Sequence, residues 1–320
     1  MIPLNARMII FDVMRKTKEK KITCSKKTVV QFSIIALCAI SIGVAGGIIA
    51  KKKFGPVETD YAGFDPEMFR ADAKSLLKEY EANPNKTFTP AELVNIGLEK
   101  YRNCENSYSI GVGQASTIVN QSIRSIQIRN KDDYFEEQIS RSSMVSLANR
   151  VNANGNNAIV HKGKAKDVEV AEYNEKAISY TSDEFKSVWG KTLQEMFIYI
   201  ISNDTVDSNK SSVTKKSGKI YVNLELDVDI ASYYYKLQMK NLSDLSALPT
   251  FEYLKQTYVF DSDMTILHST IDEKYTASMS GITANIQNNL DYYYHANEYL
   301  KIPELDEQVS YSVKGETKYE

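Results

Sequence analysis

The hydrophobic pattern of the chain is dominated by one uncharged run, residues 28–50, which lies between two clusters of lysines. A helix of these 23 residues would be about 34 Å long, enough to cross the ~30 Å hydrocarbon core of a bilayer. The apolar core of a signal peptide is shorter, about 7–15 residues, and lysines 51–53 follow this run almost directly. We therefore predict an uncleaved transmembrane helix; cleavage beside the small residues 45–47 is the alternative.

The charges that flank this run predict its orientation. Residues 1–27 contain eight lysines and arginines, whereas acidic residues soon follow the short cluster at 51–53. Because cytoplasmic flanks carry the excess of basic residues, we expect a basic cytoplasmic tail over residues 1–27 and residues 54–320 outside the cytosol, on a single-pass protein of the cell membrane.

Small residues in the predicted span recur every four positions, at Ala39, Gly43 and Gly47. Such a stripe lets two membrane helices approach closely, so it is a candidate helix-dimer face. The alternative is that glycine and alanine are simply common in membrane helices.

After a tether at residues 51–64, the pattern becomes helical over residues 65–104. Apolar residues with helical spacing predict a helix over 66–82. Thr89-Pro90-Ala91-Glu92 has the form of a capping box with proline at the first helical position, which predicts a second helix from there to about Arg102.

From residue 105 to about 300 the period changes to two, which predicts strands. Asn154-Gly155 is a strong hairpin signal. Two amphipathic helices interrupt the strands, at 183–201, after the capping box that starts at Thr181, and at 231–245; a polar mobile loop is expected at 202–219. The predicted strands are 108–112, 118–128, 134–139, 142–149, 156–161, 220–230, 250–261, 264–271, 275–279 and 282–294, with one more at 309–313 in the tail 301–320.

These elements predict an α+β fold in which a curved antiparallel sheet, resembling half a barrel, packs on amphipathic helices. The alternating strand 220–230 and the hairpin "TYVFDSDMTILHSTIDEKY", residues 257–275, resemble those of LolA-like envelope lipoproteins, over about residues 105–295. The resemblance implies an apolar cavity between sheet and helices that holds acyl chains. An anchored chain would hold such a ligand in place and would not shuttle it.

Charge is distributed unevenly along the chain. Residues 1–53 contain 11 basic and 2 acidic residues, and the rest of the chain contains 28 and 39. An acidic domain argues against nucleic-acid binding, which requires a basic face. Only one of the three cysteines, Cys104, lies beyond the apolar run, so the domain is not stapled by disulfides. Abundant lysine, asparagine, isoleucine and tyrosine are typical of a bacterial protein.

The pattern contains no catalytic, metal-binding or cofactor-binding motif. The three histidines, His161, His268 and His295, lack metal-ligand spacing, so we interpret them as structural. Acidic pairs, Asp227 with Asp229 and Asp261 with Asp263, are possible Ca²⁺ ligands; a solvated strand face and turn chemistry, respectively, explain them equally well.

Tyrosine is unusually frequent, with 21 residues and two triplets, at 233–235 and 292–294. Tyrosine rings stack on sugars or peptides and hydrogen-bond at their rim, although tyrosine is also simply a good strand former. Trp189, the single tryptophan, is either a core anchor of its helix or a ligand platform. The candidate ligand-binding residues are Trp189, Tyr233, Tyr235, Tyr292 and Tyr294.

The sequence therefore predicts a non-catalytic, membrane-anchored extracytoplasmic protein that binds a lipid-like or other ligand of the cell envelope. The alternative is an interaction protein that holds a protein or glycan partner through a tyrosine-rich sheet surface. An envelope hydrolase is a weaker third interpretation. A dry cavity wide enough for an acyl chain would favour the first, and a filled core with an exposed aromatic patch would favour the second.

Overall fold

The computed structural model of the protein describes residues 65–304, apart from 118, 144, 174, 175, 194, 244, 280 and 281, together with residues 307, 316 and 319. Four predictions lie outside the described residues: the tail 1–27, the membrane helix 28–50 with Ala39, Gly43 and Gly47, the tether 51–64 and the strand 309–313. Within the described part of the chain, no helix is both long enough and apolar enough to cross a membrane.

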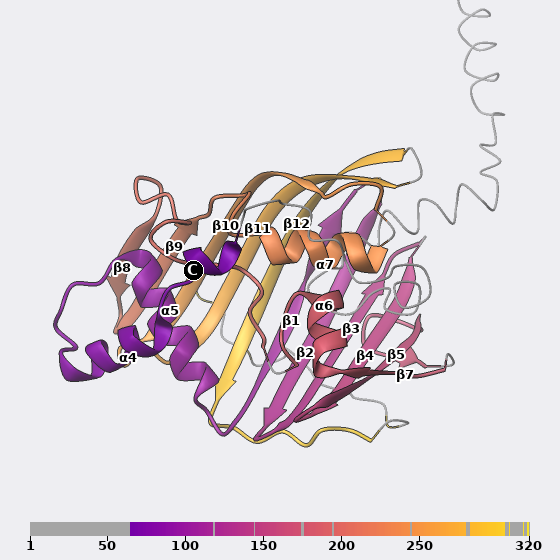
Figure 1. Cartoon of the computed structure of the whole chain (residues 1–320), viewed down its shortest axis with the longest axis horizontal. Coiled ribbons are helices and arrows are strands. Elements are labelled where there is room, and N and C mark those ends of the chain that lie inside the picture. Colours follow the sequence, from indigo (N-terminus) through magenta and orange to yellow (C-terminus); the bar gives the residue numbers. More distant parts are fainter. Residues whose placement is uncertain are drawn as a thin grey trace, which may run out of the picture.

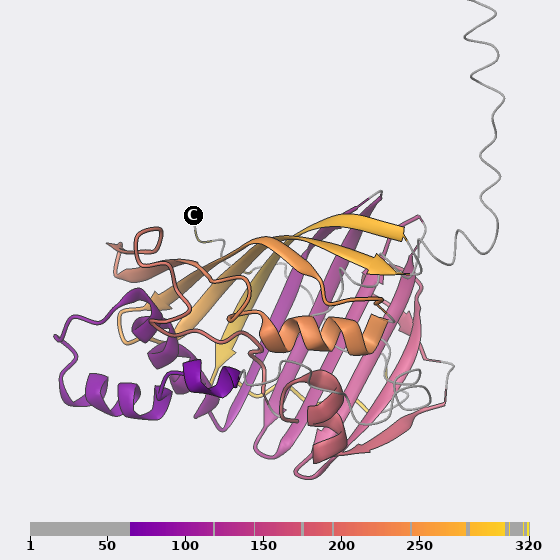
Figure 2. The same ribbon diagram turned by 45° about the horizontal axis from the view of Figure 1, so that its top comes forward.

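Twelve strands form one antiparallel sheet, which curves around the helices (Figures 1 and 2). This confirms the predicted sheet and its pairing. The spatial order is β6-β5-β4-β3-β2-β1-β12-β11-β10-β9-β8, with β7 also paired to β5. The strands are β1 Asn106–Ser116, β2 Asn120–Asn130, β3 Asp133–Arg141, β4 Ser146–Asn154, β5 Asn157–Ala165, β6 Ala171–Glu172, β7 Ile178–Thr181, β8 Ser212–Lys216, β9 Lys219–Glu225, β10 Thr250–Asp261, β11 Ile266–Met279 and β12 Ile282–Ala296.

The sheet consists of two meanders, β1 to β5 and β8 to β12, that meet where the last strand pairs with the first. Gly111 of β1 lies opposite Tyr292 of β12 in this central pair. Tight turns join most strands that are consecutive in the chain, as predicted at Asn154-Gly155, where Gly155 adopts a φ of 46°, whereas the helix α7, Tyr233–Ser243, lies in the connection between β9 and β10. A left-handed residue in a two-residue hairpin matches the twist of the strands that it joins.

The helices lie on the inner, concave face of the sheet (Figure 2). A 3₁₀ turn, η1, and a short helix, α4, replace the single helix predicted over 66–82. The capping box beginning at Thr89 is formed, with its threonine and Glu92 bonded reciprocally, and it starts α5 as predicted. The helical elements are η1 Pro66–Phe69, α4 Ala73–Ala82, α5 Pro90–Arg102, α6 Ser182–Trp189 and α7 Tyr233–Ser243.

The predicted helix 183–201 is wrong beyond its first two turns. The capping box at Thr181 starts α6, but Gly190 turns the chain away with a φ of 66°. The segment 190–201 that follows is irregular. Leu193 and Met196 still reach the core cluster around Trp189, so the apolar spacing resembled a continued helix although the backbone is not helical.

Two further boundaries differ from the prediction. β9 stops at Glu225 rather than at residue 230, because the Asp227 carboxylate accepts hydrogen bonds from the backbone amides of Asp229 and Ile230, 2.9 and 2.8 Å away. Such an Asx turn ends a strand. The region 202–219 is only partly loop, since β8 lies within it and pairs with β9 through a turn at Ser217-Gly218.

A band of polar residues crosses the inner face of the sheet. Cross-strand register aligns one buried row from β4 to β10, and its members are Asn149, Gln138, Ser125, Gly111, Tyr292, Ser269 and Tyr258. Glycine and serine in the middle of the row leave room for the two tyrosine rings beside them. The inner face is therefore not uniformly apolar, and whatever covers it must also satisfy polar groups.

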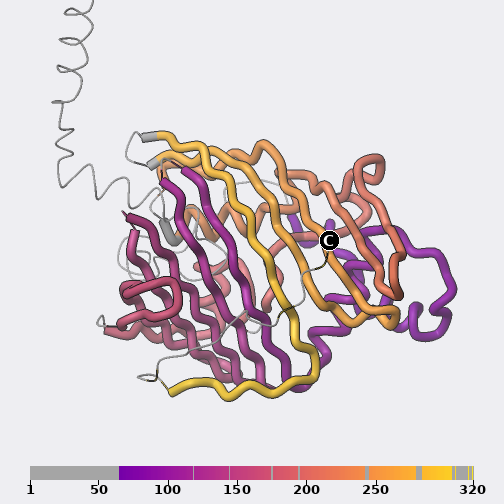
Figure 3. Tube along the Cα trace, turned by 180° about the vertical axis from the view of Figure 1, so that it is seen from behind, coloured from indigo at the N-terminus to yellow at the C-terminus, as the bar shows by residue number. Residues whose placement is uncertain are grey.

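The segment after β12, residues 297–304, runs along the lower edge of the outer face (Figure 3). Leu300 and Ile302 pack on the apolar cluster that contains Ile126 and Phe135. Arg150 is buried in a pair with Glu137 and donates hydrogen bonds to the backbone carbonyls of residues 304 and 307 at 3.3 and 2.9 Å. The predicted tail thus begins as a packed part of the fold.

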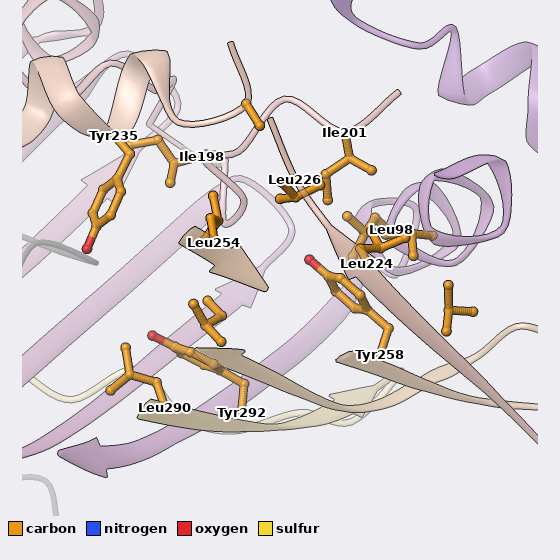
Figure 4. Packing of buried hydrophobic residues seen from close by; sticks show 14 of the residues in the cluster. Leu98, Ile198, Ile201, Leu224, Leu226, Tyr235, Leu254, Tyr258, Leu290 and Tyr292 are labelled. Carbon is orange, nitrogen blue, oxygen red and sulfur yellow. The ribbon is translucent and has the colours of Figure 1, made fainter. Parts of the chain in front are cut away.

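The main apolar core lies between α5, α7 and strands β9 to β12. Figure 4 shows Leu98, Leu224, Tyr258 and other members of this cluster facing one another from helix and sheet. Gly97 marks the closest approach: a Cβ at this position would overlap the ring of Phe260, which is fully buried. Here glycine is required by packing rather than by backbone conformation.

We expect Gly97→Ala to lower the free energy of unfolding by about 1–3 kcal/mol, the usual cost of overpacking. This loss should appear even though alanine stabilises a helix by about 1 kcal/mol relative to glycine. Urea denaturation measures this. The double variant Gly97→Ala/Phe260→Leu should lose less than the sum of its single variants. An additive double variant would show that the two sites do not touch.

Candidate functional site

A cleft of about 440 Å³ lies on the helical side of the molecule. Its walls are η1 and the start of α4, one side of α5, the irregular segment 190–201, and Tyr234 of α7. This volume lies within the 300–1,000 Å³ typical of small-molecule sites. The cleft exists because Gly190 ends α6 early, so that the following segment runs along α5 instead of continuing as a helix.

Gly190 cannot readily be replaced. Its left-handed φ of 66° disfavours any side chain, and a Cβ would lie 3.0 Å from the backbone carbonyl oxygen of Tyr234. This contact places the start of α7 beside the end of α6 and so fixes one end of the cleft.

Each carboxylate that lines the cleft already has a partner. Asp72 caps α4 through Ser75. Glu99 and Glu195 share the guanidinium of Arg102, at 3.5 and 3.3 Å.

Glu67 accepts hydrogen bonds from Tyr234 and Arg70. Burial alone would raise the pKa of Glu67, but the Tyr234 hydroxyl and the Arg70 guanidinium outweigh it, so that the pKa lies below its usual value. This acid is therefore ionised and neutralised by its own neighbours.

The cations of the cleft are less fully paired. Arg70, Arg102 and Lys191 are bound to carboxylates. Lys74 and Lys186 also line the cleft, and the ammonium group of neither forms an ion pair or hydrogen bond with any described residue. Lys186 is close enough to Glu67 to help lower its pKa, without coming into contact with it.

The floor of the cleft contains a buried ion pair. Lys191 Nζ lies 2.9 Å from Glu136 Oε2 on β3, and the two side chains are only 3% and 2% exposed. The Tyr134 hydroxyl donates a second hydrogen bond to the same oxygen, at 2.6 Å. The pair joins the segment after α6 to the sheet and fixes the cleft wall in place.

A small second cavity, about 30 Å³, lies beneath the same segment. It shares Phe197, Tyr199 and Ile201 with the cleft, and Tyr258, Tyr292 and Tyr294 line its sheet side. A water molecule needs about 10–15 Å³ by this measure, so the cavity has room for one or two waters.

The tyrosines and tryptophan predicted as ligand contacts lie mostly in the interior. Trp189 is fully buried, stacked on Phe185 at 4.5 Å and edge-on to Tyr180. Tyr233 is 6% exposed and packs edge-on against Tyr234. No surface formed by these rings is present among the described residues.

The structure brings three of the predicted residues into one region. Tyr292 and Tyr294 line the small cavity, and Tyr235 lies 5.3 Å from the ring of Tyr199, which lines both hollows. Trp189 belongs to a separate apolar cluster. Tyr233 lies neither in that cluster nor among the residues that line the two hollows. Whether any of them contacts a ligand stays a prediction.

The acidic pairs have structural partners. Asp263 binds Lys100 and the turn residue Thr265, as turn chemistry predicted. Asp227 and Asp229 do not share a strand face as expected, because they lie in the turn after β9, where Asp229 pairs with Lys236. Within the described residues, no group of three or more His, Cys, Asp or Glu side chains is placed to hold a metal ion.

Cys104 and the histidines add no reactive centre to the cleft. Burial raises the pKa of the Cys104 thiol, which disfavours the nucleophilic thiolate. His268 and His295 bind Asp291 and Glu316, each at 3.0 Å, on the outer face of the sheet.

Comparison with known proteins gives no family for this chain. No protein-family model matches it, and no curated protein is significantly similar to it.

Sequence reasoning missed the lysines of the cleft, because exposed lysines occur throughout the chain and nothing marks these two. It also missed Glu136 and Glu273. A signal existed for Glu273, since it occupies an inward position of β11 between the apolar residues Ile271 and Tyr275.

Replacing Lys191 by methionine should destabilise the protein by about 3–5 kcal/mol, because Glu136 would remain buried without its counter-charge. Urea denaturation of Lys191→Met, Lys191→Met/Glu136→Gln and Lys186→Met tests this. The double variant should recover part of the loss, and Lys186→Met, at the cleft rim, should change stability by less than about 0.5 kcal/mol. Equal effects of Lys191→Met and Lys186→Met would contradict the role of the buried pair.

Proposed function

We propose that the protein is a non-catalytic binding protein of the bacterial cell envelope, whose cleft takes a polar, anionic ligand. The uncharged run 28–50 and the basic flank before it support a single membrane anchor with the cytoplasmic tail at residues 1–27. The folded domain would then lie outside the cytosol, close to the membrane surface.

The relative sizes of the two hollows support a polar ligand rather than an acyl chain. A LolA-like carrier needs an apolar space between sheet and helices, and the curved sheet over helices agrees with that resemblance. However, the described cavity in this position holds only about 30 Å³, and the inner face there is crossed by polar residues. The cleft is larger and lined by charged and aromatic side chains.

The observation that carries the proposal is the pair Lys74 and Lys186. All four carboxylates of the cleft have partners, so these two ammonium groups are the charges left to meet a ligand. Ammonium groups bind phosphate or carboxylate as point charges. Phe197, Tyr199 and Tyr234 supply aromatic surface in the same cleft, against which the uncharged part of a ligand can stack.

The alternative, a partner held on a tyrosine-rich sheet surface, has less support, because the tyrosines that suggested it are buried or half-buried. The sheet edge at β8 offers no substitute: this strand is five residues long and carries Lys215 and Lys216, as expected of an edge protected against pairing.

Glycerol phosphate is a suitable probe, because its phosphate and hydroxyl groups occur both in phospholipid headgroups and in phosphate-bearing wall polymers. We expect the full chain, purified in detergent, to bind it in a calorimetric titration, more weakly at high salt. Lys74→Ala/Lys186→Ala should reduce the affinity about tenfold or more, the equivalent of about 1.4 kcal/mol.

The matched control is Lys78→Ala/Lys240→Ala, which removes one exposed lysine from each of α4 and α7 outside the cleft. This control should bind like the wild type. Equal binding of glycerol phosphate by both double variants would contradict an anion site in the cleft. Native mass spectrometry tests the lipid-holding alternative. A co-purified acyl lipid that Lys74→Ala/Lys186→Ala still retains would favour it.

The topology has its own test. Protease added to intact cells that express the full chain should digest the region 65–304 and leave a short membrane-embedded fragment, because the basic flank keeps the N-terminus in the cytosol. If the region stays intact while a known surface protein is digested, the proposed location is wrong.

A further inference from the structure

A buried acid, Glu273, lies under the wall of the cleft. It occupies an inward position of β11 and has no exposed surface. One carboxylate oxygen accepts hydrogen bonds from the Tyr235 hydroxyl of α7, at 2.9 Å, and from Asn288 Nδ2 of β12, at 2.7 Å. The other accepts from the Tyr199 hydroxyl of segment 190–201, at 3.0 Å. One side chain thus ties two covering elements to the sheet.

Glu273 differs from the other two carboxylates that are buried in the sheet. Glu136 is paired with Lys191, and Glu137 with Arg150, at 2.9 and 2.8 Å. Glu273 has no described lysine or arginine within ion-pair distance, and its three donors are neutral. An ionised carboxylate buried without a counter-charge is unfavourable, whereas the protonated acid is not.

A buried acceptor without a hydrogen-bond partner, on the neighbouring Asn288, is consistent with a protonated Glu273 carboxyl group. Asn288 donates its Nδ2 to Glu273, but its Oδ1 is buried without a hydrogen-bond partner. A protonated carboxyl group has a proton to donate to such an acceptor. An ionised carboxylate has no proton to give and leaves Oδ1 unsatisfied.

Electrostatics agree with this geometry. Burial is the main cause that raises the pKa of Glu273 to about 7, and the charge of the neighbouring Asp272 acts in the same direction. The hydrogen bonds from Asn288, Tyr235 and Tyr199 lower this pKa but do not outweigh burial. The surrounding titratable groups are mostly phenols, and burial raises the pKa of Tyr199, Tyr258 and Tyr292. These phenols are therefore neutral throughout the range in which Glu273 titrates.

The nearest charged groups are engaged elsewhere. On β11, Asp272 faces the outer side and accepts a bond from Tyr253, and Lys274 pairs with Glu252 of β10. On α7, Lys236 pairs with Asp229. None of them supplies a counter-charge to Glu273.

We propose that Glu273 is a proton-controlled latch: with its proton it holds Tyr199 and α7 against the sheet, and when it ionises, the buried charge without a counter-ion favours release of the segment around Tyr199 into water. This segment is the weaker of the two covers, because it is irregular, whereas α7 is a helix of 11 residues. Since Tyr199 lines the cleft, release would widen the cleft. That consequence rests on the proposed function, but the latch itself does not.

The sign of the pH effect follows from the two states. In the unfolded chain the carboxyl group ionises near the ordinary glutamate pKa of 4.5, whereas in the folded chain it keeps its proton until about 7. Stability from this group is therefore complete below the lower pKa and decreases as pH rises to the higher one. Between these two values each pH unit favours the released form by up to tenfold, and above about 7, where both forms are ionised, the effect is complete and constant.

Amide hydrogen exchange of the full chain in detergent, without any ligand, tests the latch between about pH 5 and 8.5. After correction for intrinsic rates, protection of residues 196–201 should fall by up to tenfold per unit as the pH rises to about 7 and should be constant above it. In Glu273→Gln, which cannot ionise, protection should be independent of pH. Asp272→Asn, on the same strand but the opposite face, should keep the pH-dependent fall but complete it at a slightly lower pH, because Asp272 helps to raise the pKa of Glu273.

Identical profiles for wild type and Glu273→Gln would overturn the proposal, as would an equal loss of protection in β3 and β4. If Glu273→Gln fails to fold, infrared titration of the wild type gives the answer: a protonated carboxyl band should disappear with a midpoint near pH 7, and a midpoint near 4.5 would refute the latch. Because no ligand is present, these results stand apart from those of the glycerol phosphate titration.

Discussion

The fold depends on how the polar centre of the inner sheet face is covered. A sheet face packed by helices is usually apolar, but here Glu136, Glu273 and a row of serine, asparagine and glutamine side chains lie on it. Each of these groups loses water on folding and needs a partner from above. Lys191, Tyr199 and Tyr235 are such partners, and all three come from the region that follows β7.

This requirement explains why the chain leaves helical geometry after Trp189. A continued helix would keep its backbone groups satisfied internally, but the chain turns at Gly190 and Lys191 then pairs with Glu136 on the sheet. The irregular segment is thus held by side-chain bonds to the sheet rather than by a backbone ladder. A cover held in this way is less stable than a helix, and it forms one wall of the cleft.

The two buried acids under this cover are satisfied in different ways. Glu136 has a full counter-charge in Lys191. Glu273 has only neutral donors, and a proton must replace the missing cation. The same wall therefore combines an attachment by an ion pair, at Lys191, with one by neutral donors that depends on pH, at Tyr199. Such a combination lets part of the wall move while the rest of the cleft keeps its shape.

Much of the architecture was determined by local sequence. The hairpin at Asn154-Gly155, the capping boxes at Thr89 and Thr181, and the alternation in β9 to β12 each depend on residues close together in the chain, and the structure contains all of them. The class of fold followed from their order, because short connections favour antiparallel pairing.

The sequence alone did not determine the features that depend on partners distant in the chain. The end of α6 depends on Glu136 of β3, more than fifty residues away in the chain. The burial of Tyr235 and Tyr292 depends on the curvature of the sheet around α7. The cleft lysines are recognised as a candidate anion site only because η1, α4, α5 and the segment after α6 come together in the fold. Local pattern determined the elements, whereas the tertiary structure decided which polar side chains were buried together and which charges were left to face a ligand.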